Sequence, residues 1–148
     1  VAETRNFLTG EPNVVAIWPE AVRQGKVAGA NMAGERISYP GSLPLNALDL
    51  GGLALVSAGM VNPPQDDGFE VLVRKEKNEY MKVVLKEERI VGLIMLGRIE
   101  KSGLYIRLLR ERIPVTGFKE RLLDPRFGLV NLPREYRQSW VEGVGMEI

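Results

Sequence analysis

The chain has 148 residues, of which 45% are hydrophobic and 26% charged, so it can form one folded domain with an appendage, and disordered or fibrous classes are excluded. Its 20 basic and 19 acidic residues are interspersed and leave a net charge of +1, which excludes the broad positive surface that nucleic acid requires. Since cysteine and histidine are absent, neither a disulfide framework nor a metal site is expected.

The N-terminal residues carry no leader and no capping or turn signal. The chain begins with Val1 rather than methionine, so we expect it to be cut from a longer protein. Its apolar stretches are far shorter than the about 20 residues that cross a bilayer. We therefore expect a cytoplasmic protein with no membrane partner.

The first regular elements are predicted to be a short extended segment over Asn13–Ile17 and a helix from Trp18 to about Ala33. Pro19 fits the first helical turn because its missing N–H would have no partner there, and Gly34 ends the helix. One helix face carries small side chains and a methionine at helical spacing, namely Ala21, Gly25, Ala28, Gly29 and Met32. Such a face predicts close packing against a sheet or a ligand.

The middle of the chain predicts an antiparallel sheet. Residues 35–48 are rich in proline and polar side chains and predict an extended crossover, with a domain boundary between 36 and 37. Strands are predicted over Leu53–Met60, Phe69–Arg74, Tyr80–Lys86 and Ile90–Leu96. The last three should form a meander with a tight turn at residues 86–89, and Ile90–Leu96 should be a central strand because it is apolar on both faces. Asp66-Asp67-Gly68 lacks the later ligands of a calcium loop and is predicted to be a turn.

The remaining segments predict helices that cover the sheet. Lys101–Arg112 has an apolar side and a charged side, as in an amphipathic helix. A short helical run near Phe118–Leu122 should be followed by an irregular tail on the surface. The basic residues of this region are interpreted as a solvated face rather than a binding site: Arg107, Arg110, Arg112, Lys119 and Arg121. The predicted fold class is α+β, an antiparallel sheet with covering helices.

The start of the first helix is the candidate binding site. Trp18 is a poor N-cap and Pro19 has no N–H, so the amides of Glu20, Ala21 and Val22 lack an obvious local acceptor. These donors suit a phosphate, a carboxylate or an electron-rich carbonyl such as the pyrimidine edge of a reduced flavin. The residues alone do not choose among these ligands, and at most helix starts water satisfies the amides while the aromatic side chain packs.

The sequence from Ile17 to Gly34 resembles the last helix of the FAD domain in pyridine nucleotide-dependent flavoprotein reductases. The types concerned are NADH oxidase, rubredoxin reductase and assimilatory nitrite reductase. In that family a Gly-Asp pair that binds FAD directly precedes a segment like Val1-Ala2-Glu3. Residues from Ser38 to about Ile113 resemble the C-terminal interface domain of these enzymes. The resemblance implies that residues 1–36 are the end of an FAD domain and residues 37–148 an interface or dimerisation domain.

The resemblance also implies a cofactor site and a function. FAD would lie against Trp18, Pro19, Glu20 and Ala21, and the free amides at this helix start would stabilise negative charge on the reduced flavin. The parent enzyme would pass electrons from NAD(P)H through FAD to an unidentified acceptor. This part would contribute no catalytic residue and would be inactive without the upstream FAD and NAD(P)H domains.

Two other classes of function stay open. The first is a stand-alone dimerisation or protein-interaction module. The second is a small-molecule domain that binds an anion at the helix start. Whichever function holds, the isolated chain is expected to form a homodimer through the face of small residues if that face is left uncovered, because exposed apolar patches drive association.

Overall fold

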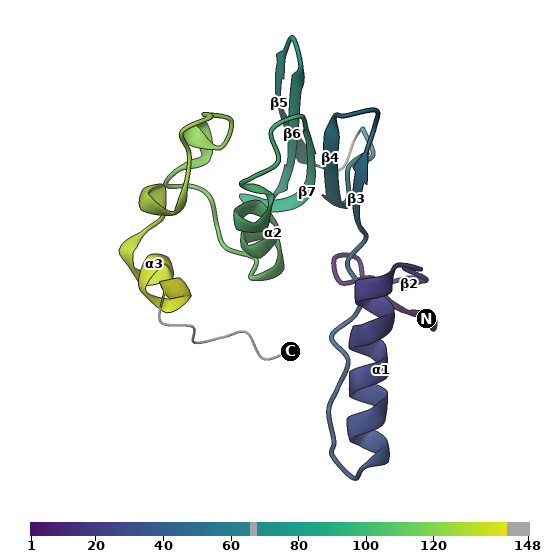
Figure 1. The fold of residues 1–148 in the computed structure, drawn as a ribbon. Coiled ribbons are helices and arrows are strands. Elements are labelled where there is room, and N and C mark those ends of the chain that lie inside the picture. Colours follow the sequence, from purple (N-terminus) through teal and green to yellow (C-terminus); the bar gives the residue numbers. More distant parts are fainter. Residues whose placement is uncertain (66–67, 142–148) are drawn as a thin grey trace. The chain divides into compact units, whose positions relative to one another are not determined.

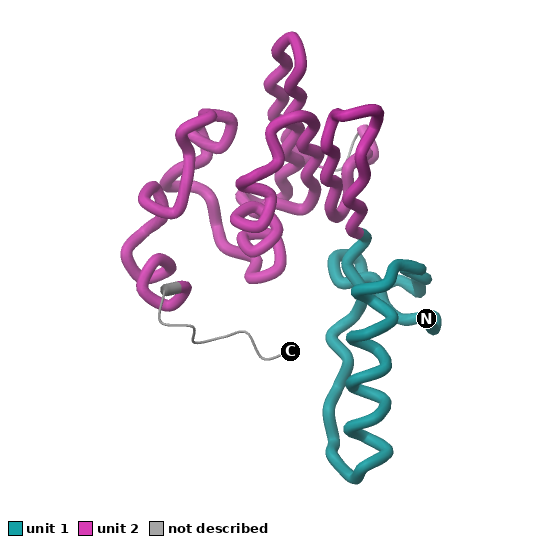
Figure 2. The backbone as a smooth tube through the Cα atoms, in the orientation of Figure 1, with its two compact units in different colours: residues 1–44, 148 teal, residues 45–147 magenta. Residues whose placement is uncertain are grey.

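A computed structural model describes residues 1–65 and 68–141 and divides the chain into two compact units, Val1–Pro44 and a unit beginning at Leu45 (Figure 2). The domain boundary expected between 36 and 37 lies N-terminal to this division and stays a prediction. The turn expected at Asp66 and Asp67 lies outside the described residues.

The first unit is built around one long helix. Strands β1 (Thr4–Arg5) and β2 (Pro12–Asn13) form a small antiparallel ribbon that precedes α1 (Trp18–Met32) (Figure 1). The predicted helix is confirmed, whereas only Asn13 of the predicted extended segment belongs to a strand. After α1 the chain turns at Gly34, whose φ of 101° suits a residue without a Cβ atom.

The segment after α1 returns to the β1–β2 ribbon. The Ser42 amide donates to the Arg5 carbonyl at 2.9 Å, and the Phe7 amide donates to the Ser42 carbonyl at 2.9 Å. The Thr4 and Ser42 hydroxyls, 2.7 Å apart, add a side-chain bond. The first unit is therefore closed by hydrogen bonds between its two ends, while most of α1 stays exposed.

The second unit contains a five-stranded antiparallel sheet in the order β3-β4-β7-β6-β5 (Figure 1). Its strands are β3 (Leu45–Asp49), β4 (Ala54–Gly59), β5 (Phe69–Glu76), β6 (Glu79–Lys86) and β7 (Arg89–Leu96). The meander β5-β6-β7 is confirmed. The central place predicted for β7 is confirmed as well, because β7 pairs with both β4 and β6.

Strand β3 is one strand of the sheet that the sequence does not predict. Residues 45–48 are expected to belong to the crossover because prolines and polar residues precede them. In the structure they pair with β4, through a turn in which Gly51 and Gly52 have φ values of 63° and 91°. The turn between β6 and β7 is confirmed, since Glu87 and Glu88 have φ values of 50° and 57°, as in the tight turns that join antiparallel strands.

Helix α2 (Ser102–Arg110) confirms the predicted amphipathic helix and packs on β7 (Figure 1). Tyr105, Leu108 and Leu109 are buried in the core on its apolar side. The cross-strand neighbours Val83 and Leu93 are also fully buried. Burial of side chains of this size stabilises the fold by about 1.5–3 kcal/mol each.

The expectation of an irregular surface tail is wrong. The short helical run predicted near Phe118–Leu122 is confirmed as the 3-10 turn η1 (Lys119–Arg121), and the tail after it forms the 3-10 turn η2 (Leu129–Asn131) and the helix α3 (Arg134–Val141). It also contributes core residues, since Leu122 and Phe127 are 0% exposed and the Phe127 ring lies 5.6 Å from that of Tyr105. The sequence hides this role because these apolar residues follow no helical or strand period.

A buried hydrogen bond joins α2 to the tail and gives a test of this packing. The Tyr105 hydroxyl donates to the Leu122 carbonyl at 2.5 Å, and burial raises the pKa of Tyr105 above its ordinary value. Tyr105→Phe leaves the buried carbonyl without a donor, so the free energy of unfolding should fall by about 1–3 kcal/mol in urea titrations.

The same residue predicts a pH dependence. Because the tyrosine pKa is higher in the folded chain than in the unfolded chain, the unfolded chain loses its proton first as the pH rises past the ordinary value of 10.0. The stability contribution of Tyr105 is therefore complete below that pH and declines above it. The free energy of unfolding of Tyr105→Phe should therefore fall less above this pH than that of the unsubstituted protein. An identical fall in both proteins would show that Tyr105 does not cause it.

Candidate functional site

The start of α1 offers fewer free amides than the sequence predicts. Ile17 is the N-cap in an extended conformation and makes no side-chain cap bond. Its carbonyl accepts from the Ala21 amide at 3.0 Å, which is the first helical hydrogen bond, and Val22 lies inside the regular helix. The prediction that the Ala21 and Val22 amides are free is therefore wrong. Within the described chain, the amides of Trp18 and Glu20 have no acceptor.

The four candidate site residues surround this helix start in different environments. The Trp18 side chain is 81% exposed and Pro19 is exposed, while Ala21 is half-buried. Glu20 is 0% exposed. The first turn of α1 therefore carries both an uncovered aromatic ring and a buried carboxylate.

The Glu20 carboxylate is a feature that sequence reasoning missed. Its Oε2 accepts a hydrogen bond from Arg23 Nη2 at 2.5 Å, whereas its Oε1 is buried without a partner among the described residues. The spacing of Glu20 and Arg23, three residues apart on a helix, is a signal from which the ion pair could have been predicted. Nothing in the sequence indicated the burial.

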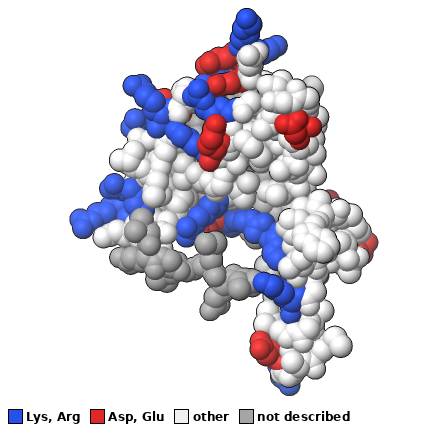
Figure 3. All heavy atoms as spheres, in the orientation of Figure 1, with Lys and Arg blue, Asp and Glu red and all other residues white. Residues whose placement is uncertain are grey.

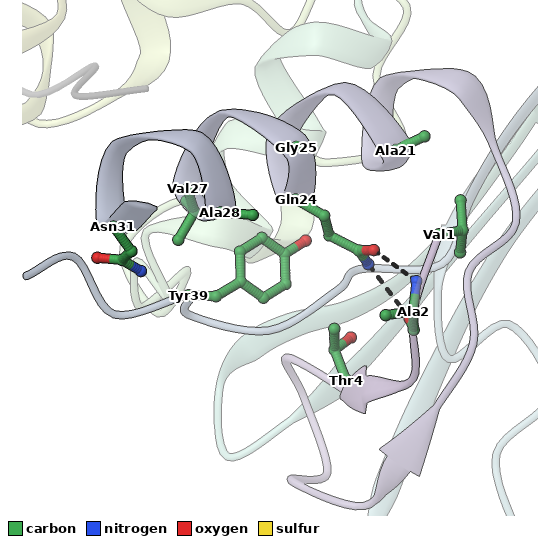
Figure 4. Close-up of a pocket in the computed structure, with 10 residues that line it drawn as sticks. All are labelled: Val1, Ala2, Thr4, Ala21, Gln24, Gly25, Val27, Ala28, Asn31 and Tyr39. Carbon is green, nitrogen blue, oxygen red and sulfur yellow. Dashed lines mark hydrogen bonds between the residues drawn. The ribbon is translucent and has the colours of Figure 1, made fainter. Parts of the chain in front are cut away.

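A groove runs along the face of small residues on α1 (Figure 4). Its volume is about 520 Å³, and it is open and mainly apolar. Figure 4 shows Tyr39 lying alongside α1 and Gln24 reaching towards Ala2, whose amide donates to Gln24 Oε1 at 2.8 Å. The groove is lined by Val1, Ala2, Thr4, Ala21, Gln24, Gly25, Val27, Ala28, Asn31 and Tyr39.

The groove is wide because the helix lacks large side chains there. A Cβ atom added at Gly25 or Gly29 would meet no heavy atom within 4 Å. Ala28 and Met32 are exposed, with Met32 at 89%. The sequence predicted close packing on this face, and the described chain itself leaves the face open.

The basic cluster of the second unit is largely engaged in structural contacts. Arg107 pairs with Glu111 at 2.5 Å and stacks on the Trp140 ring at 4.3 Å. Lys119 lies 3.0 Å from both Glu70 and Glu88, and hydrogen bonds to these carboxylates raise the pKa of Lys119. On the face shown in Figure 3, acidic side chains lie among the basic ones. These contacts agree with the interpretation as a charged surface rather than a ligand site.

The described ranges, 1–65 and 68–141, contain neither a membrane-spanning helix nor a metal cluster. No helix there combines the length and apolar character needed to cross a membrane. No group of three acidic side chains there could hold a metal ion.

Comparison with known proteins shows which proteins the chain resembles. Residues 44–113 match the rubredoxin NAD+ reductase C-terminal domain. The chain is 30% identical over 127 residues to the NADH-dependent phenylglyoxylate dehydrogenase subunit epsilon of Aromatoleum evansii, covering 82% of this chain and 30% of that protein.

Two solved structures share the fold. One is an NAD-dependent persulfide reductase from A. fulgidus, with a TM-score of 0.64 at 16% identity, covering 76% of this chain and 24% of that one. The other is an FAD-dependent pyridine nucleotide-disulphide oxidoreductase from Desulfovibrio vulgaris, with a TM-score of 0.60 at 24% identity, covering 76% and 31%. The chain thus spans less than a third of the length of each of these three proteins.

The matched domain covers the whole β3–β7 sheet and α2, and the α+β fold agrees with that of both structures. The resemblance of this region to a reductase C-terminal domain is therefore confirmed. The chain thus carries a rubredoxin NAD+ reductase C-terminal domain and is similar to the C-terminal part of longer pyridine nucleotide-dependent oxidoreductases.

Proposed function

We propose that this chain is the C-terminal part of a cytoplasmic flavoprotein reductase that passes electrons from NAD(P)H through FAD to an acceptor. The NADH oxidase, rubredoxin reductase and assimilatory nitrite reductase types are the candidates for the parent. The chain would supply two parts of this enzyme, namely the helix start that faces the flavin and the C-terminal domain. Its partners would be the upstream FAD and NAD(P)H domains, and a second copy of the protein is a further candidate.

The observation that supports this proposal is the chemistry of the α1 start. The amides of Trp18 and Glu20 have no acceptor in the described chain, and they lie at the positive end of the helix dipole. An electron-rich carbonyl at the edge of a flavin ring fits such donors, and Trp18 offers an exposed aromatic surface beside them. The donor set therefore fits FAD.

The hydride and electron chemistry would be supplied by FAD when it is bound. The residues of this chain would bind and orient the flavin edge and stabilise negative charge near it through the two amides. They would supply no proton donor or acceptor for the reaction, so the chain alone is proposed to be inactive.

The open groove on α1 supports the proposal that upstream domains cover this helix. An apolar face made of glycine and alanine allows a second element to approach very closely, and the described chain does not provide that element. In the parent, the FAD domain would supply it.

The first test is an absorbance spectrum of the purified full-length parent before and after anaerobic addition of NADH. A flavin band that bleaches with NADH is expected, together with no flavin binding by the isolated chain. A parent without flavin would contradict the proposal of a flavoprotein reductase and would favour the alternative that the chain is a stand-alone dimerisation module. The exposed side chains of Trp18 and Met32 on α1 are the observation in favour of that second candidate.

A further inference from the structure

We infer that the part of the parent polypeptide upstream of Val1 docks on the face of the β3–β7 sheet opposite α2, and that its carboxylates pair there with Lys75 and Lys82. The inference rests on the proposed function only in taking this chain as the C-terminal part of a longer protein. It adds to the groove on α1 a docking surface in the second unit.

One face of the sheet is covered by the chain itself. Helix α2 packs on β7, and alternate residues of the three inner strands are at most 5% exposed and form part of the core. These residues are Val56, Ala58, Met81, Val83, Leu93 and Met95. When an antiparallel sheet has one core face and one solvated face, the residues that alternate with the core positions are typically polar. The opposite face of this sheet departs from that pattern.

The opposite face, here called the outer face, is mainly apolar and open. Cross-strand neighbours point to the same side of a sheet, and two rows of them define this face. The rows are Leu48, Leu55, Leu96, Tyr80 and Lys75, and Asn46, Ser57, Ile94, Lys82 and Val73. None of these residues is buried in the described chain, and Leu48 and Val73 at the two sheet edges are each 49% exposed. Exposed apolar patches of this kind mark interaction sites.

The charges of the outer face are of one sign. Lys75 and Lys82 are its charged residues, and neither row contains an aspartate or a glutamate. Neither lysine forms an ion pair within the described part of the chain. Lys82 is half-buried and stands between Val73 and Ile94 of the neighbouring strands. Covering an ammonium group without a partner is costly, so whatever docks here must bring carboxylates as well as apolar side chains.

A second copy of the chain does not fit this surface. A two-fold interface places the same patch of both subunits face to face, so lysines would oppose lysines across it. The size of the face also disfavours a separate protein. Two rows about 7 Å apart on five strands about 4.8 Å apart give the face roughly 350 Å². A stable complex of separate chains buries about 800 Å² on each partner.

A domain of the same polypeptide can dock on so small a face. Attachment through the chain gives it a high effective concentration at the sheet, so few contacts are enough. The compared proteins contain such upstream polypeptide, because this chain spans less than a third of their length. The upstream part is therefore the occupant that satisfies the charge and the size of the outer face together.

The test uses the full-length parent as an equal mixture of isotope-labelled and unlabelled protein. A carbodiimide, which joins an ammonium group to a carboxylate in direct contact, is added, and the linked peptides are identified by mass spectrometry. Lys75 or Lys82 should be joined to an aspartate or glutamate upstream of Val1, with both peptides carrying the same label. Links with mixed labels would assign the outer face to a second copy and overturn the inference. The absence of any link from these two lysines to the upstream part would overturn it as well.

Charge reversal on the outer face gives an independent measurement. In Lys82→Glu of the full-length parent, a carboxylate would face the upstream carboxylates, so docking should weaken and the Lys75 amine should be acylated about 10-fold faster. Lys77→Glu is the matched control, because Lys77 is exposed in the turn between β5 and β6 and its reversal changes the net charge equally. There the Lys75 rate should change about twofold or less. Equal Lys75 rates in the two variants would contradict docking on this face.

The flavin content of the parent is measured separately, from its absorbance spectrum. A parent that binds no flavin but shows the upstream link would overturn the proposed function and support this inference. A parent that binds flavin and lacks the link would overturn this inference alone. The link is measured in the unsubstituted protein, so this decision does not depend on the folding of a variant.

Discussion

Replacing Gly92 by alanine is expected to destabilise the sheet unit strongly, although it adds only one methyl group. Gly92 lies in the central strand β7, opposite Gly59 of β4 and Val84 of β6. A Cβ atom there would lie 2.0 Å from the Met60 carbonyl oxygen, far inside van der Waals contact. Met60 cannot withdraw easily, because its amide donates to the Val91 carbonyl at 2.8 Å.

The expected loss in the free energy of unfolding is at or above the upper end of the about 1–3 kcal/mol typical of overpacking. Urea unfolding followed by near-UV circular dichroism would measure it, since Tyr80 and Tyr105 lie in this unit. Gly103→Ala is the matched control, because the added Cβ atom meets nothing within 4 Å and lies in helix α2. There alanine should be neutral or stabilising by up to about 1 kcal/mol. Equal stability of the two variants would show that Met60 does not pass over Gly92 in this way.

In the sheet, the local residue pattern predicted some strands and not others. Strands β5, β6 and β7 were predictable because each combines β-branched residues with a turn at its end. Strand β3 was not, since its sequence Leu-Asn-Ala-Leu-Asp has no strand composition of its own and depends on pairing with β4. Its strand state is thus a consequence of tertiary context.

The C-terminal tail is a second region whose structure could not be predicted from the sequence. Phe118, Leu122 and Phe127 enter the core from 3-10 turns and loops, where no period marks the buried side. Lys101 further fixes this segment by donating to the carbonyls of Pro125 and Phe127, both at 2.6 Å. Such long-range contacts between a lysine and backbone carbonyls leave no signal in the sequence.

At the candidate site, the helix and the place of its proline could be predicted from the sequence. The hydrogen bonds of the amides at the helix start could be predicted only in part. The number of free amides depends on which residue is the N-cap. Because the N-cap is Ile17, its carbonyl accepts the hydrogen bond from the Ala21 amide, which is therefore not free. The unpartnered oxygen of Glu20 could not be inferred from composition, because burial of a glutamate is set by the packing around it. This buried, unpartnered oxygen was therefore visible only in the structure.

Leucines on the small-residue face of α1 are expected to have opposite effects in the isolated chain and in the full-length reductase. In the isolated chain, Gly25→Leu with Gly29→Leu places side chains into open space, since no heavy atom lies within 4 Å of either Cβ position. Leucine is the better helix former by nearly 1 kcal/mol per site, so thermal unfolding followed at 222 nm should show a more stable α1.

In the full-length reductase the same two leucines should displace the element that we propose covers the small-residue face of α1. Overpacking of about 1–3 kcal/mol per site would separate α1 from the rest of the FAD domain, and the purified protein should lose most of its flavin. Lys26→Leu is the control, because Lys26 is exposed on α1 and belongs neither to the face of small residues nor to the groove lining. It should keep its flavin. If the double leucine variant binds flavin as well as the control does, the groove is uncovered in the parent too, and an interface with a second copy becomes the better account of this face.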